Sequence, residues 1–313
     1  MDAEKPIGPV PTDIDVLDPR FAPVVALGPE LERLATGAIW SEGPVWIAED
    51  DSVLWSDIPN DRMLRWSAKD GMRVWRERVE FTNGHARDLD GSLLHCSHGL
   101  RAVFRTNVDG GAQRTVVDRW QGRRFNAPND IVVKSDGTIW FTDPPYGLII
   151  PEEGHGGESE IGDCYVFRHD PRTNALDPVT DLPEHPNGLA FSPDESLLYV
   201  SDTSGALPEH GSNHCIWAFD VVDGCRLANG RMFAEVSPGV PDGFRLDVQG
   251  WIYTSAQDGV QVLHPDGTLI GRIRVPEKVG NLTFGGPDRD VLYIAASTSL
   301  YRIRLATRGV QRP

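Results

Sequence analysis

The chain has 313 residues, a formal net charge of −16 and 40% hydrophobic residues. This length allows two ordinary domains or one large all-β domain, and the hydrophobic content is sufficient for a core. The negative charge argues against nucleic acid as a partner and suits a cation or a neutral small molecule better. No run reaches the length of a membrane span, so a membrane is not expected as a partner either.

The cysteines and the N-terminus bear on the compartment. Cys96, Cys164, Cys215 and Cys225 form no CxxC pair and are too few for a disulfide scaffold, so reduced thiols are expected. The N-terminal residues lack the basic and apolar regions of a signal peptide. This indicates a cytoplasmic protein, or a periplasmic one if a leader has been removed. A monomer and a homodimer both agree with the sequence.

The first residues differ in pattern from the rest of the chain. Residues 1–25 are rich in proline and have no hydrophobic period, which predicts an irregular N-terminal arm ahead of a single domain over residues 26–313. Residues 29–35 are the only modest helical candidate. From Gly37 onward, short β-prone runs alternate with turn signals, which predicts an all-β protein.

One unit recurs along the β-prone region. A short polar residue, usually next to proline or glycine, opens a β-prone run, and a turn and a second apolar run follow. The openers are Glu42, Asn83, Asn129, Asn187, Asp242 and Asn281. Their spacings of 41, 46, 58, 55 and 39 residues match a four-stranded propeller blade, with loop insertions in two blades. We therefore predict a six-bladed β-propeller with four-stranded antiparallel blades around a central metal-binding channel.

Two segments are long for hairpin loops, namely residues 148–161 and 205–213. Both are polar and rich in glycine, and we expect them to stand over one face of the propeller. They could form a functional lid or be tolerated insertions, and the sequence favours neither.

The opening residues suggest a metal site. In a closed ring the first strand of each blade lines the axis, so the openers would point toward the channel mouth. Glu42 and Asp242 would supply carboxylates there, and Asn129 and Asn187 would supply amide oxygens. Such residues are common in turns when taken singly, but their recurrence at one register favours a site. An all-oxygen site suits Ca²⁺ best, with Mg²⁺, Mn²⁺ or Zn²⁺ as alternatives.

Several motifs resemble those of a known family. They are Glu42-Gly-Pro-Val-Trp46, residues 124–132, residues 140–147, residues 186–194 and Pro241-Asp-Gly-Phe244. Together they resemble the SMP-30/gluconolactonase/luciferin-regenerating (regucalcin-like) family of six-bladed propellers, from about residue 37 to residue 303. Residues 141–147 look most like the bacterial gluconolactonase branch. The resemblance implies a catalytic divalent metal held by Glu42, Asn187 and Asp242, with Asn129 as a further ligand or a substrate contact.

The chemistry that follows is metal-dependent hydrolysis of a sugar lactone, D-glucono-1,5-lactone or a related aldonolactone, to the aldonic acid. Asp242 is the candidate to steer or deprotonate the attacking water. Arg124, His98 and Tyr146 are candidate substrate contacts. For His98, a structural hydrogen bond in a turn is an equally good interpretation. For Tyr146, packing within its loop is the stronger one.

Two alternatives remain open. The same site could hydrolyse lactones promiscuously or act on organophosphate triesters. A non-catalytic propeller that binds Ca²⁺ or a partner belongs to a different class. The presence of both carboxylates and both amides disfavours this last alternative.

Overall fold

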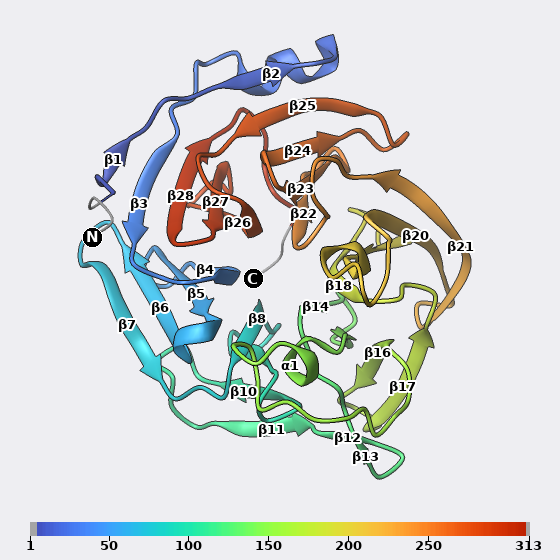
Figure 1. Ribbon diagram of the computed structural model, residues 1–313. Coiled ribbons are helices and arrows are strands. Elements are labelled where there is room, and N and C mark those ends of the chain that lie inside the picture. Colours follow the sequence, from blue (N-terminus) through green and yellow to red (C-terminus); the bar gives the residue numbers. More distant parts are fainter. Residues whose placement is uncertain (1–4, 311–313) are drawn as a thin grey trace.

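The computed structural model describes residues 5–310 and confirms the predicted six-bladed β-propeller. Six antiparallel sheets stand around one axis, and the first strand of each sheet lies nearest to it (Figure 1). The first three blades are β4 to β7 (Ser41–Ile47, Ser52–Asp57, Arg62–Ser67, Gly71–Glu77), β8 to β11 (Thr82–Arg87, Leu93–Ser97, Ala102–Thr106, Arg114–Val117) and β14 to β17 (Ile131–Val133, Ile139–Asp143, Tyr165–Asp170, Ala175–Thr180).

The remaining blades follow the same order from the axis outward. They are β18 to β21 (Pro186–Phe191, Leu197–Asp202, Cys215–Val222, Arg226–Glu235), β22 to β25 (Phe244–Leu246, Ile252–Ala256, Gly259–Leu263, Leu269–Arg274) and β26 to β28 (Val279–Gly285, Val291–Ala296, Ser299–Arg304). A two-stranded hairpin, β12 and β13 (Arg119–Trp120, Arg123–Arg124), lies outside this order.

The ring is closed by strands from both ends of the chain. The sixth blade takes its fourth strand from β3 (Glu32–Thr36), which pairs with β28 in the register Ser299↔Thr36. The helix predicted for residues 29–35 is therefore wrong. Its helical pattern spans only two turns, whereas β28 offers a complete row of backbone hydrogen-bond partners.

The N-terminal segment is more ordered than the sequence indicated. Of the residues predicted to form an irregular arm, β1 (Gly8–Pro9) pairs with β3 and β2 (Ile14–Val16) pairs with β25. A 3₁₀ helix, η1 (Pro19–Val25), follows and buries Phe21 against the last two blades. Residues 8–25 thus extend two blades at their outer edges, while residues 1–4 of the predicted arm lie outside the described residues.

The core lies between neighbouring blades. Alternate side chains of a strand point to opposite faces of its sheet, so each blade has two faces to cover. Trp55 and Leu64 of the first blade, for example, pack against Tyr293 and Leu300 of the sixth. All four cysteines are free, in agreement with the expected thiols.

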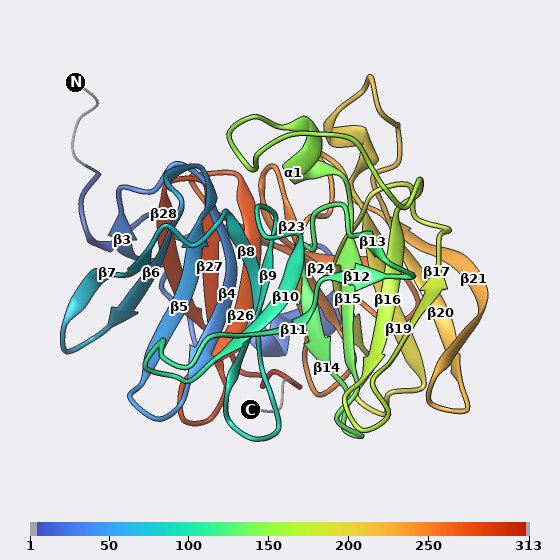
Figure 2. The ribbon, with the colours of Figure 1, turned by 90° about the horizontal axis from the view of Figure 1, so that it is seen from below.

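The two faces of the ring differ. Figure 2 shows the short helix α1 (Tyr146–Ile149) and the two long segments, residues 148–161 and 205–213, on one face, as expected from the sequence. Within residues 5–310, no helix is both long and apolar enough to cross a membrane.

We predict that the N-terminal segment contributes substantially to stability. Replacing Phe21, which is 0% exposed, with alanine should lower the free energy of unfolding by about 3–5 kcal/mol, because a large cavity would remain beside the closed ring. Denaturant unfolding of this variant and of Leu27→Ala measures the effect. Leu27 is 83% exposed, so its variant should change stability by less than about 0.5 kcal/mol. Equal stability of the two variants would show that the segment is dispensable.

Candidate active site

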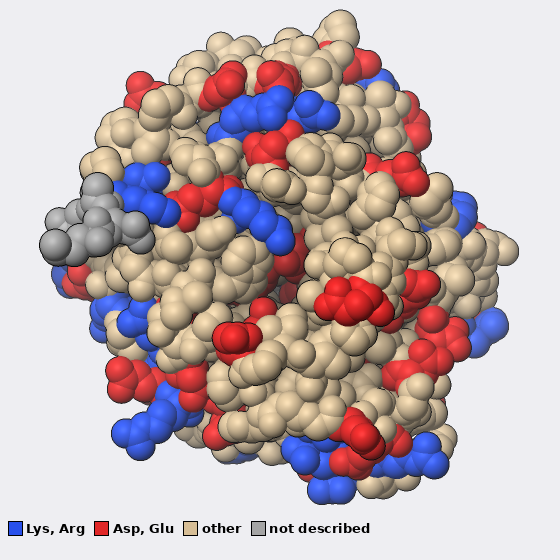
Figure 3. All heavy atoms as spheres, viewed as in Figure 1, with Lys and Arg blue, Asp and Glu red and all other residues tan. Residues whose placement is uncertain are grey.

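The predicted openers meet at one end of the channel. Glu42, Asn129, Asn187 and Asp242 line a single pocket together with Tyr146. The Asp242 carboxylate contacts the side chains of both Asn187 and Glu42. The face that carries this pocket has a central hollow in which acidic atoms lie deep (Figure 3). The structure therefore brings together the four side chains proposed as metal ligands, which come from blades one, three, four and five.

Glycines beside the axis allow this convergence. Gly84 donates its N–H to the carbonyl of Asn129 at 2.8 Å, and Gly188 does the same to Asp242 at 3.1 Å. A Cβ atom on Gly84 would lie 2.4 Å from the Asn129 oxygen, and one on Gly188 would lie 2.5 Å from the Asp242 oxygen. Real side chains do not approach backbone so closely. Glycine after the opener is therefore what lets neighbouring first strands touch.

The same contact corrects the sixth opener. Gly243 donates its N–H to the carbonyl of Gly280 at 2.9 Å, so Gly280 and not Asn281 occupies the equivalent position in the sixth blade. Asn281 lies one residue further along β26 and directly faces Gly243. The sequence reverses the usual order here, with glycine before asparagine, and this caused the shift by one residue.

Hydroxyl groups fix the backbone of the openers from the neighbouring blade. In three blades, a hydroxyl on the second strand donates to the carbonyl of the next opener. The pairs are Ser56 with Asn83 at 2.8 Å, Thr142 with Asn187 at 2.7 Å, and Ser201 with Asp242 at 2.7 Å. Sequence reasoning missed these residues, although each ends the apolar run of its second strand.

The two carboxylates create an electrostatic problem. Glu42 is 3% exposed, and its Oε2 accepts from the Gly43 N–H at 2.9 Å. Its Oε1 is buried and has no hydrogen-bond partner among the described residues. Burial and the Asp242 charge raise the pKa of Glu42 well above its ordinary value, although the Asn281 amide opposes this. Burial also raises the pKa of Asp242, and the Lys278 ammonium opposes the rise. Such a pair calls for a proton or a cation.

The amide groups hold hydrogen bonds around the site, and the Asn187 side chain also donates to the Asp242 carboxylate. Asn187 donates from Nδ2 to the hydroxyl of Thr203 at 3.2 Å. The Nδ2 atom of Asn129 lies 3.5 Å from Nε2 of His98, and the Nδ2 atom of Asn83 lies 3.4 Å from it. The carbonyl oxygens of the amides are therefore available to a ligand in the pocket.

His98 lies behind the site rather than in it. It is 1% exposed, it is absent from the pocket lining, and its Nδ1 lies 3.0 Å from the carbonyl oxygen of Glu153. Burial lowers the pKa of His98 to about 4, so the ring is neutral at neutral pH. Because the Glu153 carbonyl can only accept a hydrogen bond, Nδ1 carries the proton, and Nε2 accepts from the amide groups of Asn83 and Asn129. These contacts favour a positioning role, and a direct substrate contact stays a prediction.

The other two predicted substrate contacts differ in whether they line the pocket. Tyr146 lines the pocket, and its hydroxyl bonds to that of Thr203. Arg124, in the outer hairpin, does not line the pocket, and its backbone N–H donates to Glu160 at 2.8 Å. This position does not support the prediction that Arg124 contacts the substrate. Arg124 lies in the outer hairpin, and the chain approaches the channel only over the residues that follow it, up to Asn129.

Sequence reasoning missed the residues that form the rim. Trp40, Val240 and Lys278 line the pocket, and each lies two residues before the axial position of its blade. The period of a strand, counted back from the correct opener, would have found them. The Lys278 ammonium lies 5.0 Å from the ring centre of Trp40. Glu153 and Leu207 complete the rim, so both long segments contribute to the pocket.

Comparison with known proteins agrees with this geometry. The arrangement is that of a six-bladed propeller with a carboxylate–amide site at one end of its channel. Residues 40–298 match the family model described as the SMP-30/gluconolactonase/LRE-like region. The chain therefore belongs to the SMP-30/gluconolactonase/LRE-like family, as the sequence motifs indicated.

Three similar proteins are informative. A gluconolactonase from Zymomonas mobilis is 32% identical over an aligned length of 320, which covers 95% of this chain and 87% of that protein. Pentonolactonase XacC from Haloferax volcanii is 28% identical over 260 residues, which cover 82% of this chain and 81% of that protein. A solved structure of a gluconolactonase from Xanthomonas campestris is 39% identical, covers 96% of this chain and 97% of its own, and superimposes with a TM-score of 0.88.

A buried histidine pair supports the second blade beside the site. Ser56 contacts His85 Nε2 at 3.0 Å, His85 Nδ1 contacts His95 Nδ1 at 2.8 Å, and His95 Nε2 contacts Thr106 at 2.9 Å. Burial lowers the pKa of His85 to about 3 and that of His95 well below its ordinary value. Both rings therefore stay neutral in the folded protein well below the pH at which they would ionise in the unfolded chain.

This pair predicts a loss of stability in acid. Below pH about 6.5 these histidines bind protons in the unfolded chain but stay neutral in the folded protein. The stability of the fold above that pH is therefore lost progressively as pH falls toward 3. Each such histidine steepens the decline by up to about 1.4 kcal/mol per pH unit. Denaturant unfolding between pH 7 and 4 should show a shallower decline for His95→Gln than for the unmodified protein. The exposed His210→Gln serves as control, and equal slopes in both variants would contradict the prediction.

Proposed function

We propose that the protein is a lactonase that hydrolyses a sugar lactone to the aldonic acid with the help of one bound divalent cation. The observation that carries the proposal is the pairing of the buried Glu42 and the Asp242 carboxylate at the channel mouth, beside two amide side chains. Membership of the family and the similarity to gluconolactonases from Zymomonas mobilis and Xanthomonas campestris support the reaction class.

The donor set fits a divalent cation. Glu42 has a buried oxygen without a hydrogen-bond partner among the described residues, and the Asp242 carboxylate contacts the Glu42 side chain. The amide nitrogen of Asn129 lies near His98, and that of Asn187 donates to Thr203 and contacts Asp242. Among residues 5–310, no three His, Cys, Asp or Glu side chains form a metal cluster, so any cation here relies on the amides as well. Four oxygen donors suit a hard cation, and Ca²⁺ is the ion that we propose, with Mg²⁺, Mn²⁺ or Zn²⁺ as alternatives.

The bound cation would polarise the lactone carbonyl and stabilise the negative charge that develops on its oxygen. Asp242 takes a proton from the attacking water while the water oxygen bonds to the carbonyl carbon. The bond between that carbon and the ring oxygen then breaks. The ring oxygen takes this proton from Asp242 and leaves as a hydroxyl group, which regenerates the base, and the aldonic acid loses its own proton to solvent. Asp242 is the candidate for this role because it is the only aspartate among the openers and lines the pocket beside the other proposed donors.

The rim offers contacts for the hydroxyl groups of a sugar. Tyr146 and Thr203 present hydroxyls, and Lys278 presents an ammonium that can donate to a sugar oxygen. Leu207 and Val240 cover the apolar part of the pocket. Aldonolactones of five or six carbons match this combination, consistent with the similarity to a pentonolactonase from Haloferax volcanii.

We predict that activity depends on the cation and on Asp242. In a pH-indicator assay with D-glucono-1,5-lactone, chelator treatment should abolish turnover above the spontaneous rate, and Ca²⁺ should restore it. Asp242→Asn should lower kcat by about 100-fold or more, since the base is lost while the oxygen donor at the cation is kept. Asp266→Asn changes an exposed carboxylate on an outer hairpin and should leave the rate unchanged.

Either of two results would overturn this mechanism. Full activity in the presence of chelator would exclude the cation, and full activity of Asp242→Asn would exclude the proposed base. Cation binding without any lactone turnover would instead favour the non-catalytic alternative. A panel of sugar lactones, assayed with Ca²⁺, Mg²⁺, Mn²⁺ and Zn²⁺ added to chelator-stripped protein, identifies the substrate and the ion.

We also predict that Lys278 contributes to substrate binding. Lys278→Met removes a charge-assisted hydrogen bond to a sugar oxygen, so KM should rise about tenfold or more while kcat changes less than about threefold. Steady-state kinetics of this variant and of Lys69→Met, on an exposed turn of the first blade, measure the difference. A fall in kcat at constant KM would show that Lys278 acts in the chemical step instead.

A further inference from the structure

A second pocket lies at the opposite end of the channel. The first strands begin at the candidate active site and end at this pocket, which is lined by Arg87 on β8, Val133 on β14, Phe191 on β18, Leu246 on β22, and Val310. Its cavity has a volume of about 100 Å³. None of its lining residues belongs to the candidate active site. It is therefore a separate feature of the channel.

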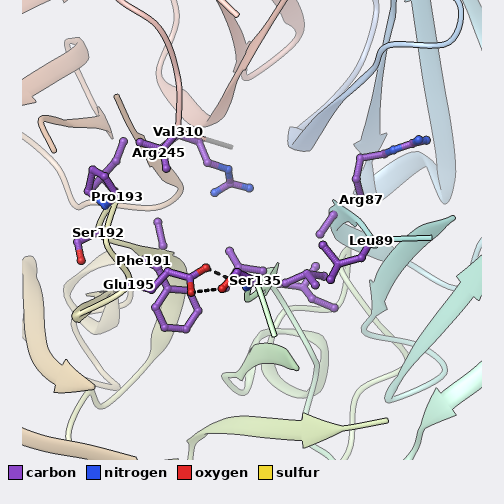
Figure 4. Close-up of a pocket in the computed structure, with 15 residues that line it drawn as sticks. Arg87, Leu89, Ser135, Phe191, Ser192, Pro193, Glu195, Arg245 and Val310 are labelled. Atoms are coloured by element: carbon purple, nitrogen blue, oxygen red, sulfur yellow. Dashed lines mark hydrogen bonds between the residues drawn. The ribbon is translucent and has the colours of Figure 1, made fainter. Parts of the chain in front are cut away.

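Arg245 dominates this pocket. It follows Asp242 by three residues on the strand nearest the axis, and it is only 2% exposed. Figure 4 shows its guanidinium group reaching into the space between the pocket walls, while that of Arg87 points away. One nitrogen, Nη1, donates to Asp130 Oδ2 at 3.2 Å and to the carbonyl of Phe244 at 2.7 Å.

The other two nitrogens of Arg245 are free. Nε and Nη2 are buried and have no hydrogen-bond partner among the described residues. They form the edge of the guanidinium group that matches both oxygens of a carboxylate. The chain uses this edge in that way elsewhere. Arg20 holds Asp18 through Nε and Nη2 at 2.9 and 2.8 Å, and Arg172 holds Asp170 through the same atoms at 3.1 Å each.

No group of the described pocket wall hydrogen-bonds to this edge. The carboxylate of Glu195 already accepts from Ser135 and pairs with Lys134 at 3.2 Å, and the Ser192 hydroxyl donates to Asp194 at 2.7 Å. A buried charged group that lacks hydrogen bonds costs at least about 1–3 kcal/mol. A single water occupies roughly 10–15 Å³ of such a cavity, so the space exceeds what one or two waters need. A ligand that accepts hydrogen bonds from Nε and Nη2 would therefore remove this cost, and the cavity has space for it.

The rest of the wall limits what the ligand can be. Apart from Arg87, Ser135, Ser192 and Glu195, the side chains that line the pocket are mostly aliphatic or aromatic, among them Leu89, Ile131, Val133, Phe191, Leu246 and Val310. A polyhydroxylated sugar acid would leave its hydroxyl groups unpaired against these walls. A compact carboxylate with an apolar body would satisfy both the charge and the walls.

We propose that this pocket binds a small apolar monocarboxylate, such as a short fatty acid or an aromatic acid, through the Nε and Nη2 edge of Arg245. The proposal rests on the far end of the channel alone and stands apart from the proposed function.

Saturation-transfer NMR and titration calorimetry on the full chain with its cation test this. Benzoate and butyrate are the probes, and benzamide and butyramide are their neutral counterparts. The acids should bind at least tenfold more tightly than the amides. Arg245→Gln should weaken acid binding at least tenfold. Val133→Phe should do the same by filling the cavity, and it leaves the Arg245–Asp130 pair intact in case the first variant fails to fold.

Two control variants place the binding. Arg87→Gln changes an arginine that points away from the cavity and should alter affinity less than twofold. Glu42→Gln disables the opposite mouth, where a carboxylate could meet the cation, and should leave acid binding intact.

Several results would overturn the proposal. Absence of binding would mean that the pocket holds water only. Equal binding of acids and amides would exclude recognition by Arg245. Binding of inorganic phosphate but of neither acid would show a different class of anion, and loss of binding in Glu42→Gln would place the acids at the cation instead.

Discussion

Close contact between first strands at the axis is the constraint on which the site depends. Where Gly84 and Gly188 face the next opener, there is no room for a Cβ atom. The backbones of neighbouring first strands therefore touch, and the side chains of the openers point into the channel mouth. This packing holds Glu42 and Asp242 in one small pocket, where burial opposes the ionisation of both and the Asp242 charge further opposes that of Glu42. The fold thus creates a place where a positive charge is needed, and it does so with backbone geometry.

The rest of the molecule keeps that geometry fixed. The hydroxyl groups of Thr142 and Ser201 tie Asn187 and Asp242 to the blades before them. The ring itself is held by β3, which completes the last blade, and by Phe21, which covers the outer side of the fifth and sixth. Because these contacts come from strands and not from mobile loops, the donor atoms are positioned before any ligand arrives.

The sequence was sufficient for the fold and for the meeting of the four proposed donor side chains in one pocket, because both depend on a local pattern that repeats. It was insufficient where a long-range contact decides the outcome. Residues 32–36 became a strand only because β28 lay beside them. Asn281 was misplaced by one residue, since only the hydrogen bond from Gly243 to Gly280 reveals the true register. His98 and Arg124 lie close to the site in sequence, but the direction of a side chain out of a turn is set by packing. Lys278 became recognisable only once the register of its blade was known.

The position after the opener explains how the channel continues below the site. It is glycine in four blades, but Asp130 and Asn281 take its place in the third and sixth. Both are larger, and Gly84 and Gly243 of the preceding blades leave the room that they need. Asp130 thereby adds a third buried carboxylate, which raises the pKa of both Glu42 and Asp242. Arg245 pairs with Asp130 at 3.2 Å and balances that charge inside the channel. A buried ion pair of this kind is costly to break from either side, so the channel below the site keeps Arg245 and Asp130 together.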